Sequence, residues 1–217
     1  MNDNINLGAS TTIGSHILPG EPLIELSKIT NGHIKLTILS SKKIIEGVKN
    51  GIFDLGLIES SIFDDALVYQ KWIEDELVVC SKASLGEAID QEVISHCQLL
   101  CRREHSPTRQ LITGFLKEHA LSYTHFDSLM EIDNSTSAIQ GIKWSKPDRE
   151  HPTVAIVSQL AIEDEIERKE LYLSRIDGVP IMRSFYIIYD KKKRDSDRIA
   201  KVVNYLTTLQ HATEQPS

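Results

Sequence analysis

Hydroxyl and amide side chains stand at the places where the sequence pattern predicts that four helices begin. Their residues are Ser10, Thr11 and Thr12; Ser40 and Ser41; Ser106 and Thr108; and Asn134, Ser135 and Thr136. The first turn of a helix offers backbone N–H groups without helical partners and the positive end of the helix dipole. Such turns can bind an anion or a carboxylate. The same residue types are the preferred N-caps of any helix, so one cluster alone is better explained by capping.

Two charged side chains stand close to these clusters. Glu59 comes directly after a predicted strand and could accept a hydrogen bond from an amine or hydroxyl of a ligand, although an exposed loop carboxylate is the simpler interpretation. Arg109 could pair with a ligand carboxylate through its guanidinium fork. It could equally point into solvent from the first turn of its helix.

Catalytic chemistry finds little support in the sequence. No GxSxG, HExxH, P-loop or GxGxxG motif occurs, and the eight histidines show no metal-ligand spacing. Cys97 and Cys101 would lie about 13 Å apart within one strand, beyond disulfide reach, an objection that weakens if Cys97 lies in a turn. We therefore expect buried free thiols, no catalytic residue, no metal and no cofactor.

Strands and helices alternate from the start of the chain. Strands are predicted at 5–9, 34–38 and 53–58, separated by helices that carry Ile17 to Leu26 and Ile44 to Val48 and that end at Asn-Gly pairs. This order in under sixty residues is typical of a parallel α/β sheet. The carboxyl ends of parallel strands meet at one edge, so the polar helix starts should converge there.

The alternation breaks and then resumes. Two strands, 66–70 and 76–81, follow one another without a helix, and a second unit is predicted to begin near Lys82. That unit has predicted strands at 99–101, 124–132 and 154–157 and helices at 106–120, 134–142 and 159–168. A strand at 185–189 and an amphipathic helix at 197–209 end the chain. The apolar stripe of that helix, Ile199, Val202, Val203, Leu206 and Leu209, is expected to close the core of the first unit.

Composition and charge narrow the function classes. The 217 residues are 41% hydrophobic and 25% charged, which is ordinary for a globular protein. With 24 basic against 31 acidic residues the net charge is -7, the wrong sign for a surface that mainly binds nucleic acid. No apolar run approaches a membrane span, no signal peptide is evident, and three cysteines suit a reducing compartment, so we expect a cytoplasmic protein.

Four segments together carry a family resemblance. They are 7–14 with Leu18 and Pro19, 47–57, 103–109 and 134–136. In their order and spacing they resemble the effector-binding domain of LysR-type transcriptional regulators, which has the fold of type 2 periplasmic binding proteins. The resemblance spans most of the chain. It weakens at the polar loop 143–152, where the family usually has a Gly-rich turn running straight into a strand.

The resemblance implies an α/β fold of two Rossmann-like subdomains, residues 5–80 plus 182–213 and residues 81–181. Two crossover strands would join them, with a ligand cleft between. It places Ser10, Thr11, Thr12 and Ser40 in that cleft from the first subdomain, and Thr108 and Ser135 from the second. It also implies a homo-oligomer in which the first helix of one subunit meets the second subdomain of the other. DNA binding would require a winged helix-turn-helix, which does not precede Asn6 here.

The function implied is sensing of a small, anionic effector. Its binding would favour one placement of the subdomains and so alter attached DNA-binding segments in the oligomer. Two alternatives remain. One is a solute-binding receptor of a transport system, which shares the fold; the other is an enzyme on the same scaffold, for example with a dehydratase-like activity, which the missing acid/base pairing disfavours.

Overall fold

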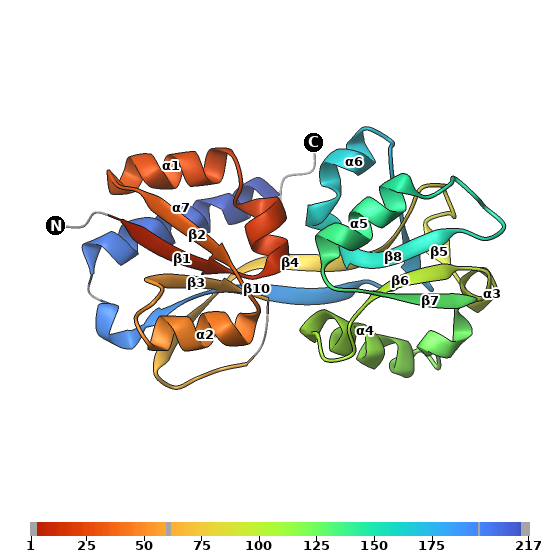
Figure 1. Ribbon diagram of the computed structural model, residues 1–217, viewed down its shortest axis with the longest axis horizontal. Helices are drawn as coiled ribbons and strands as arrows, with labels where there is room; N and C mark the ends of the chain where they lie inside the picture. The colour runs from red at the N-terminus through yellow and green to blue at the C-terminus, as the bar shows by residue number, and fades with distance from the viewer. Residues whose placement is uncertain (1–3, 60–61, 195, 214–217) are drawn as a thin grey trace. The chain divides into compact units, whose positions relative to one another are not determined.

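The computed structural model describes residues 4–59, 62–194 and 196–213. The chain forms two compact units: unit 1 contains Met1–Glu74 and Ser184–Ser217, and unit 2 contains Asp75–Arg183. Helices and strands alternate in both, and the predicted α/β fold class is confirmed (Figure 1).

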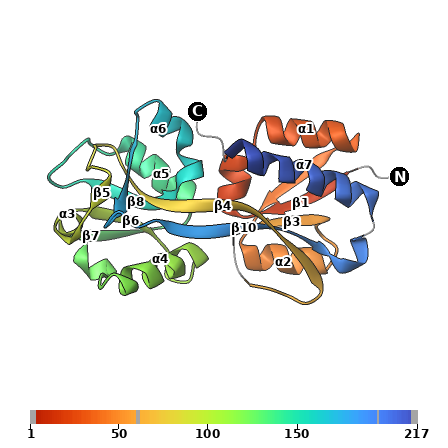
Figure 2. The same ribbon diagram turned by 180° about the vertical axis from the view of Figure 1, so that it is seen from behind.

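Unit 1 is built on a parallel sheet with one added antiparallel strand. Its elements are β1 Ile5–Ala9, β2 Ile34–Ile38, β3 Leu55–Ile58 and β10 Ile181–Asp190, with α1 Glu21–Thr30, α2 Ser41–Lys49 and α7 Asp197–Thr213. β1 lies between β2 and β3 and is parallel to both, while β10 runs antiparallel to β3. α1 and α7 pack together on one face of this sheet and α2 covers the other (Figures 1 and 2).

The apolar stripe of α7 closes the core of unit 1, as predicted. Ile199, Val202, Val203 and Leu206 are all buried. Trp72, on the strand that leaves this unit, donates its indole N–H to the carbonyl of Leu206 at 2.6 Å. This hydrogen bond avoids the cost of an unsatisfied donor in the core, so the burial of the indole ring stabilises unit 1 fully.

Unit 2 repeats the parallel arrangement. Its elements are β4 Leu67–Ser81, β5 Ala88–Ile89, β6 Gln98–Arg102, β7 Ser128–Ile132, β8 Thr153–Ser158 and β9 Tyr172–Ile176, with α3 Gln91–Ser95, α4 Pro107–Glu118, α5 Ser135–Trp144 and α6 Glu163–Glu167. β6 lies between β7 and β8 and is parallel to both; β4 is antiparallel to β8 and β9. α4 covers one face, and α5 with α6 the other (Figure 2).

Two strands carry the chain from one unit to the other, which confirms that prediction. β4 crosses the boundary after Glu74 and β10 crosses it after Arg183. The prediction of two separate strands at 66–70 and 76–81 was wrong, because β4 is one strand of 15 residues. Asp75, in the middle of the charged run Glu74-Asp75-Glu76, is buried and paired with Arg183, and the strand continues through it.

Several predicted boundaries shift for local reasons. The first helix is divided: a five-residue π-helix, Ile13–Ile17, precedes Gly20, whose φ of +90° ends the helical path before α1. The predicted helix 159–168 is a 3₁₀ turn, Gln159–Ala161, followed by α6. A 3₁₀ turn also takes the first part of the predicted strand 124–132. The sequence pattern did not predict β5 and α3, because they are too short to show a periodicity.

No helix within the described residues is both long enough and apolar enough to cross a membrane.

Candidate functional site

Three parallel strands of unit 1 end at one edge, and polar residues follow them. Ala9 is in register with Ile38 of β2 and with Leu57 of β3. Ser10, Ser40 and Glu59 come within two residues of these strand ends. Inside unit 1, the structure therefore brings together polar side chains that the sequence placed at one sheet edge.

Ser10 is the most unusual of these residues. It is 2% exposed. Its backbone N–H donates to the carbonyl of Leu57 at 2.9 Å, and its own carbonyl accepts from Gly14 at 2.8 Å. Its hydroxyl, by contrast, has no hydrogen-bond partner among the described residues. Leaving a buried hydroxyl without a hydrogen-bond partner costs free energy of folding.

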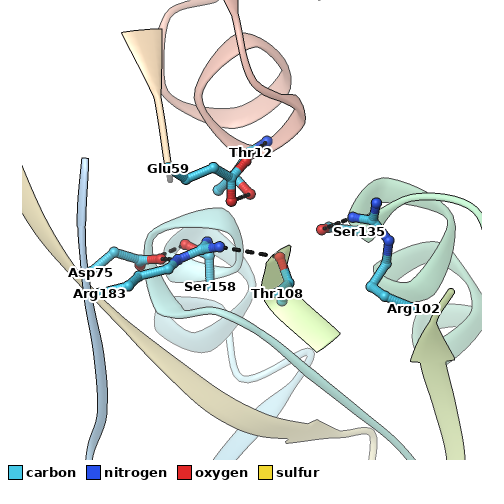
Figure 3. A network of polar contacts seen from close by, with 8 residues as sticks. All are labelled: Thr12, Glu59, Asp75, Arg102, Thr108, Ser135, Ser158 and Arg183. Carbon is cyan, nitrogen blue, oxygen red and sulfur yellow. Dashed lines mark hydrogen bonds and ion pairs between the residues drawn. The ribbon is translucent and has the colours of Figure 1, made fainter. Parts of the chain in front are cut away.

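Thr12 and Glu59 form a second polar contact in unit 1 (Figure 3). The Thr12 backbone N–H lies 3.4 Å from Glu59 Oε1, and the Thr12 hydroxyl donates to Oε2 at 3.2 Å. Glu59 is half-buried, so the interpretation as an exposed loop carboxylate was wrong. Thr11, between Ser10 and Thr12, is half-buried.

Ser40 and Ser41 begin α2. Ser40 is the N-cap residue, but its side chain makes no capping hydrogen bond and is exposed. Ser41 is buried at the first helical position. Side-chain capping of α2 therefore does not explain why serines occupy positions 40 and 41.

In unit 2, the first residue of each predicted cluster caps its helix. The Ser106 hydroxyl accepts from the backbone N–H of Arg109 at 3.1 Å, at the start of α4. The Asn134 amide oxygen accepts from Ser137 at 2.8 Å, at the start of α5. These two side chains are committed to helix ends. Thr108 and Ser135, one or two residues further along, are buried instead, and Thr136 is half-buried.

A buried ion pair stands beside Thr108 (Figure 3). Arg183 donates from Nε to Asp75 Oδ2 at 2.7 Å, and the two side chains are 7% and 0% exposed. Asp75 Oδ1 accepts a 2.6 Å hydrogen bond from the Ser158 hydroxyl. Arg183 Nη1 lies 3.4 Å from Thr108 Oγ1. The carboxylate thus anchors a guanidinium that reaches a predicted ligand residue.

A second guanidinium stands beside Ser135. Arg102 is the last residue of β6, and its Nη1 donates to Ser135 Oγ at 3.1 Å (Figure 3). Because Ser135 is the first residue of α5, the contact lies at a strand's carboxyl end and a helix N-terminus together. A guanidinium and the positive end of a helix dipole therefore both favour a negative charge at this position.

Arg109 does not point freely into solvent, because it is half-buried and contacts other residues of unit 2. Its Nη1 donates to the carbonyl of Arg102 at 2.8 Å and contacts Cys101 Sγ at 2.6 Å. Its guanidinium carbon lies 4.0 Å from the centre of the Tyr123 ring, within the range of a cation–π contact. These contacts tie Arg109 Nη1 and one face of its guanidinium to other residues of unit 2.

The three cysteines are buried and free, as expected. Burial raises the pKa of Cys80 to about 12, with a further contribution from the Glu165 carboxylate, and burial raises the pKa of Cys97 to about 11. Burial also raises the pKa of Cys101, although the Arg109 guanidinium opposes the rise. Protonated thiols of this kind are poor nucleophiles and poor metal ligands. Within the described residues, no group of three or more His, Cys, Asp or Glu side chains could hold a metal ion.

The family follows from comparison with known sequences. A model of the LysR substrate binding domain matches residues 2–210. The chain belongs to this family. The resemblance noted in the four sequence segments is thereby confirmed. A similar relative is the uncharacterized HTH-type transcriptional regulator YeiE of Escherichia coli K12, 24% identical over 94% of this chain and 68% of that protein.

Solved structures share the fold over nearly the whole chain. The effector-binding domain of QuiR in complex with shikimate has a TM-score of 0.71 at 17% identity, covering 96% of this chain and 97% of that one. The regulatory domain of Synechocystis PCC6803 CcmR in complex with 2-PG has a TM-score of 0.74 at 20% identity, covering 99% of each chain. The predicted type 2 periplasmic-binding-protein fold is thus confirmed.

Sequence reasoning missed Asp75, Arg102, Ser158 and Arg183. Asp75 carried one signal, because a carboxylate between Ile73 and Leu77 occupies a position that should be buried in a strand. Arg102 carried another, as a cation at the carboxyl end of a predicted parallel strand. Ser158 and Arg183 gave none, because their partners are distant in sequence.

Proposed function

We propose that this chain is the sensing domain of a LysR-type regulator and that it binds a small, anionic effector. The contact residues we propose are Ser10, Thr11 and Thr12 in unit 1, and Thr108 and Ser135 in unit 2. The observation that carries the proposal is the buried Ser10 hydroxyl, which lacks a hydrogen-bond partner in the described part of the chain. A bound acceptor would remove that cost. Shikimate bound to QuiR and 2-PG bound to CcmR support a small-molecule ligand on this fold.

The signal transmitted is a shift of population. An effector that binds one arrangement of the protein more tightly than another favours that arrangement, and the difference in affinity limits the effect. We propose that DNA-binding segments joined to this domain respond, and that no bond is made or broken. The relative YeiE is named a transcriptional regulator, which supports a regulatory function rather than transport or catalysis. A regulator works where its DNA is, so we expect a cytoplasmic protein.

Exposed apolar side chains support the proposed homo-oligomer. In unit 1, Ile24 on α1 and Ile38 on β2 are 49% and 42% exposed; in unit 2, Leu129 and Met130 on β7 are 43% and 42% exposed. A second copy that laid its α1 and β2 against β7 would remove these groups from water. Ile24→Glu should then shift the sedimentation coefficient towards that of a monomer, and an unchanged value would contradict this interface.

The effector site is tested by ligand-induced thermal stabilisation. A metabolite library is screened against the 217-residue chain, and each compound that raises the melting temperature is measured again on a Thr11→Ala, Ser135→Ala double variant. We expect at least a tenfold weaker apparent affinity, because two polar contacts are lost. Ser95→Ala with Thr208→Ala, at exposed positions on other helices, is the matched control. Equal stabilisation of all three proteins would exclude the assigned residues.

A further inference from the structure

A hollow in unit 2 borders α4 and the 3₁₀ turn Tyr123–His125. Its volume is about 430 Å³, within the range of small-molecule sites. Six residues line it: Glu104, His105, Arg109, Gln110, Thr113 and Tyr123. None of them is a contact residue of the proposed effector site, so this hollow is a separate candidate site.

One guanidinium in the wall of this hollow has a fixed orientation. Arg109 Nη1 donates to the carbonyl of Arg102 and contacts Cys101 Sγ. One face of the group lies against the Tyr123 ring, with the guanidinium carbon 4.0 Å from the ring centre. A charged group held by three contacts loses little conformational freedom when a ligand binds to it.

The remaining edge of the guanidinium is open to a ligand. Within the described residues, Arg109 Nε and Nη2 make no hydrogen bond, and the guanidinium forms no ion pair. These two nitrogens form one edge of the planar group, and such an edge matches the two oxygens of a carboxylate. A ligand carboxylate would give this half-buried charge the partner that the described chain does not supply.

A charge of the opposite sign lines the same hollow. Glu104 is exposed, and in the part of the chain that the structure describes it has neither a hydrogen bond nor an ion pair. It therefore does not pair with Arg109. A simple anion would be attracted by Arg109 and repelled by Glu104, whereas a ligand with both signs offers each residue its opposite. Charge complementarity thus favours a zwitterion.

We propose that this hollow of unit 2 binds an α-amino acid, with its carboxylate on the Nε and Nη2 edge of Arg109 and its ammonium on Glu104. The two charged groups of an α-amino acid are attached to one carbon, so a single small ligand can contact both residues. Gln110 and Thr113 line the remaining wall and would contact the side chain of the ligand. This site goes beyond the proposed function, and either can fail without the other.

The test compares ligands that carry both charges with ligands that carry one. The twenty common L-amino acids are titrated into the 217-residue chain by calorimetry. The tightest binder is then compared with two analogues, one without the α-ammonium and one without the α-carboxylate. We expect each analogue to bind at least tenfold more weakly, because it loses a charged contact. No binding of any amino acid up to about 10 mM, or equal binding of either analogue, would overturn the inference.

Two variants locate the site. Arg109→Lys keeps the charge but removes the guanidinium edge, and it should weaken the amino acid at least tenfold. Glu104→Gln changes an exposed residue and so should leave the fold intact. It should weaken the amino acid at least tenfold, yet leave the analogue without the ammonium within twofold of its wild-type affinity. Unchanged binding of the amino acid to Glu104→Gln would overturn the inference, even if Arg109→Lys fails to fold.

Arg103→Lys and Glu92→Gln are the matched controls. Arg103 is exposed and pairs with Asp133 at 2.8 Å, and Glu92 is exposed on α3. Neither lines this hollow, so amino-acid binding should stay within twofold of wild type in both. Losses as large as those in the test variants would overturn the inference, because the effect would not depend on the hollow.

Binding at the effector site gives a different result. An amino acid whose binding is lost in the Thr11→Ala, Ser135→Ala variant and kept in Glu104→Gln would be an effector. That outcome would overturn the present inference while the proposed function stands.

Discussion

The Arg183 guanidinium and the Asp75 carboxylate join two strands 108 positions apart in sequence, through a 2.7 Å hydrogen bond that solvent does not reach. Each residue is adjacent to a point where the chain passes between unit 1 and unit 2. Burying two charges carries a large desolvation penalty, which only good geometry and further hydrogen bonds offset. Here Ser158 and Thr108 supply those bonds.

Asp75→Asn should strongly destabilise the fold. It leaves the Arg183 charge buried beside a neutral amide, and breaking one side of a buried pair typically costs about 3–5 kcal/mol. Urea unfolding followed by tryptophan fluorescence and by circular dichroism measures the loss. Glu74→Gln, which breaks an exposed pair with Lys71 on the same strand, should leave the midpoint unchanged. A double variant, Asp75→Leu with Arg183→Met, should recover most of the stability; no recovery would contradict the assigned cause.

Two helical glycines should respond to alanine in opposite directions. A Cβ at Gly47 in α2 would clash with Cδ2 of the buried Phe53 ring, so Gly47→Ala must displace a core side chain and should cost about 1–3 kcal/mol. A Cβ at Gly114 in α4 meets nothing within 4 Å. Gly114→Ala should stabilise by about 0.5–1 kcal/mol through helix propensity. Thermal unfolding distinguishes the two, and stabilisation by both would contradict the packing at Phe53.

Stability should fall at alkaline pH because of Cys80. Its pKa rises from 9.0 to about 12 on folding, mainly through burial, so the folded chain holds a proton that the unfolded chain releases. The contribution is complete below about pH 9 and is lost between about pH 9 and 12, by about 1.4 kcal/mol per pH unit. Cys80→Ala should flatten the decline between pH 8 and 10.5. Part of the slope should remain, because burial also raises the pKa of Cys97.

Ser10→Ala should have opposite effects on stability and on binding. Removing a buried hydroxyl that has no partner in the described residues should raise the melting temperature of the unliganded chain, by the equivalent of about 1–2 kcal/mol. If Ser10 contacts the effector, the stabilisation that a library compound produces should shrink in the same variant. A lower melting temperature without ligand would show that the hydroxyl is already satisfied, and would remove the main support for this residue's role.

Much of the fold was predictable because it depends on local pattern. Alternating apolar residues indicated strands in both units, and Asn-Gly pairs marked the ends of the first two helices. The order of these elements indicated the parallel sheets. The polar residues at the helix starts were also visible. The sequence alone does not separate capping from ligand contact, since Ser, Thr and Asn serve both purposes with the same side-chain oxygen.

Only the tertiary structure assigned those residues. Ser106 and Asn134 proved to cap their helices, while Thr108 and Ser135 accept from arginines. Sequence spacing determines which residues share a helical turn, because neighbours along the chain are held by the backbone. The choice of Arg183 as the partner of Asp75, and of Arg102 as the partner of Ser135, depends on which strands lie side by side. Packing of the whole sheet decides which strands are neighbours, so no short stretch of sequence predicts these pairs.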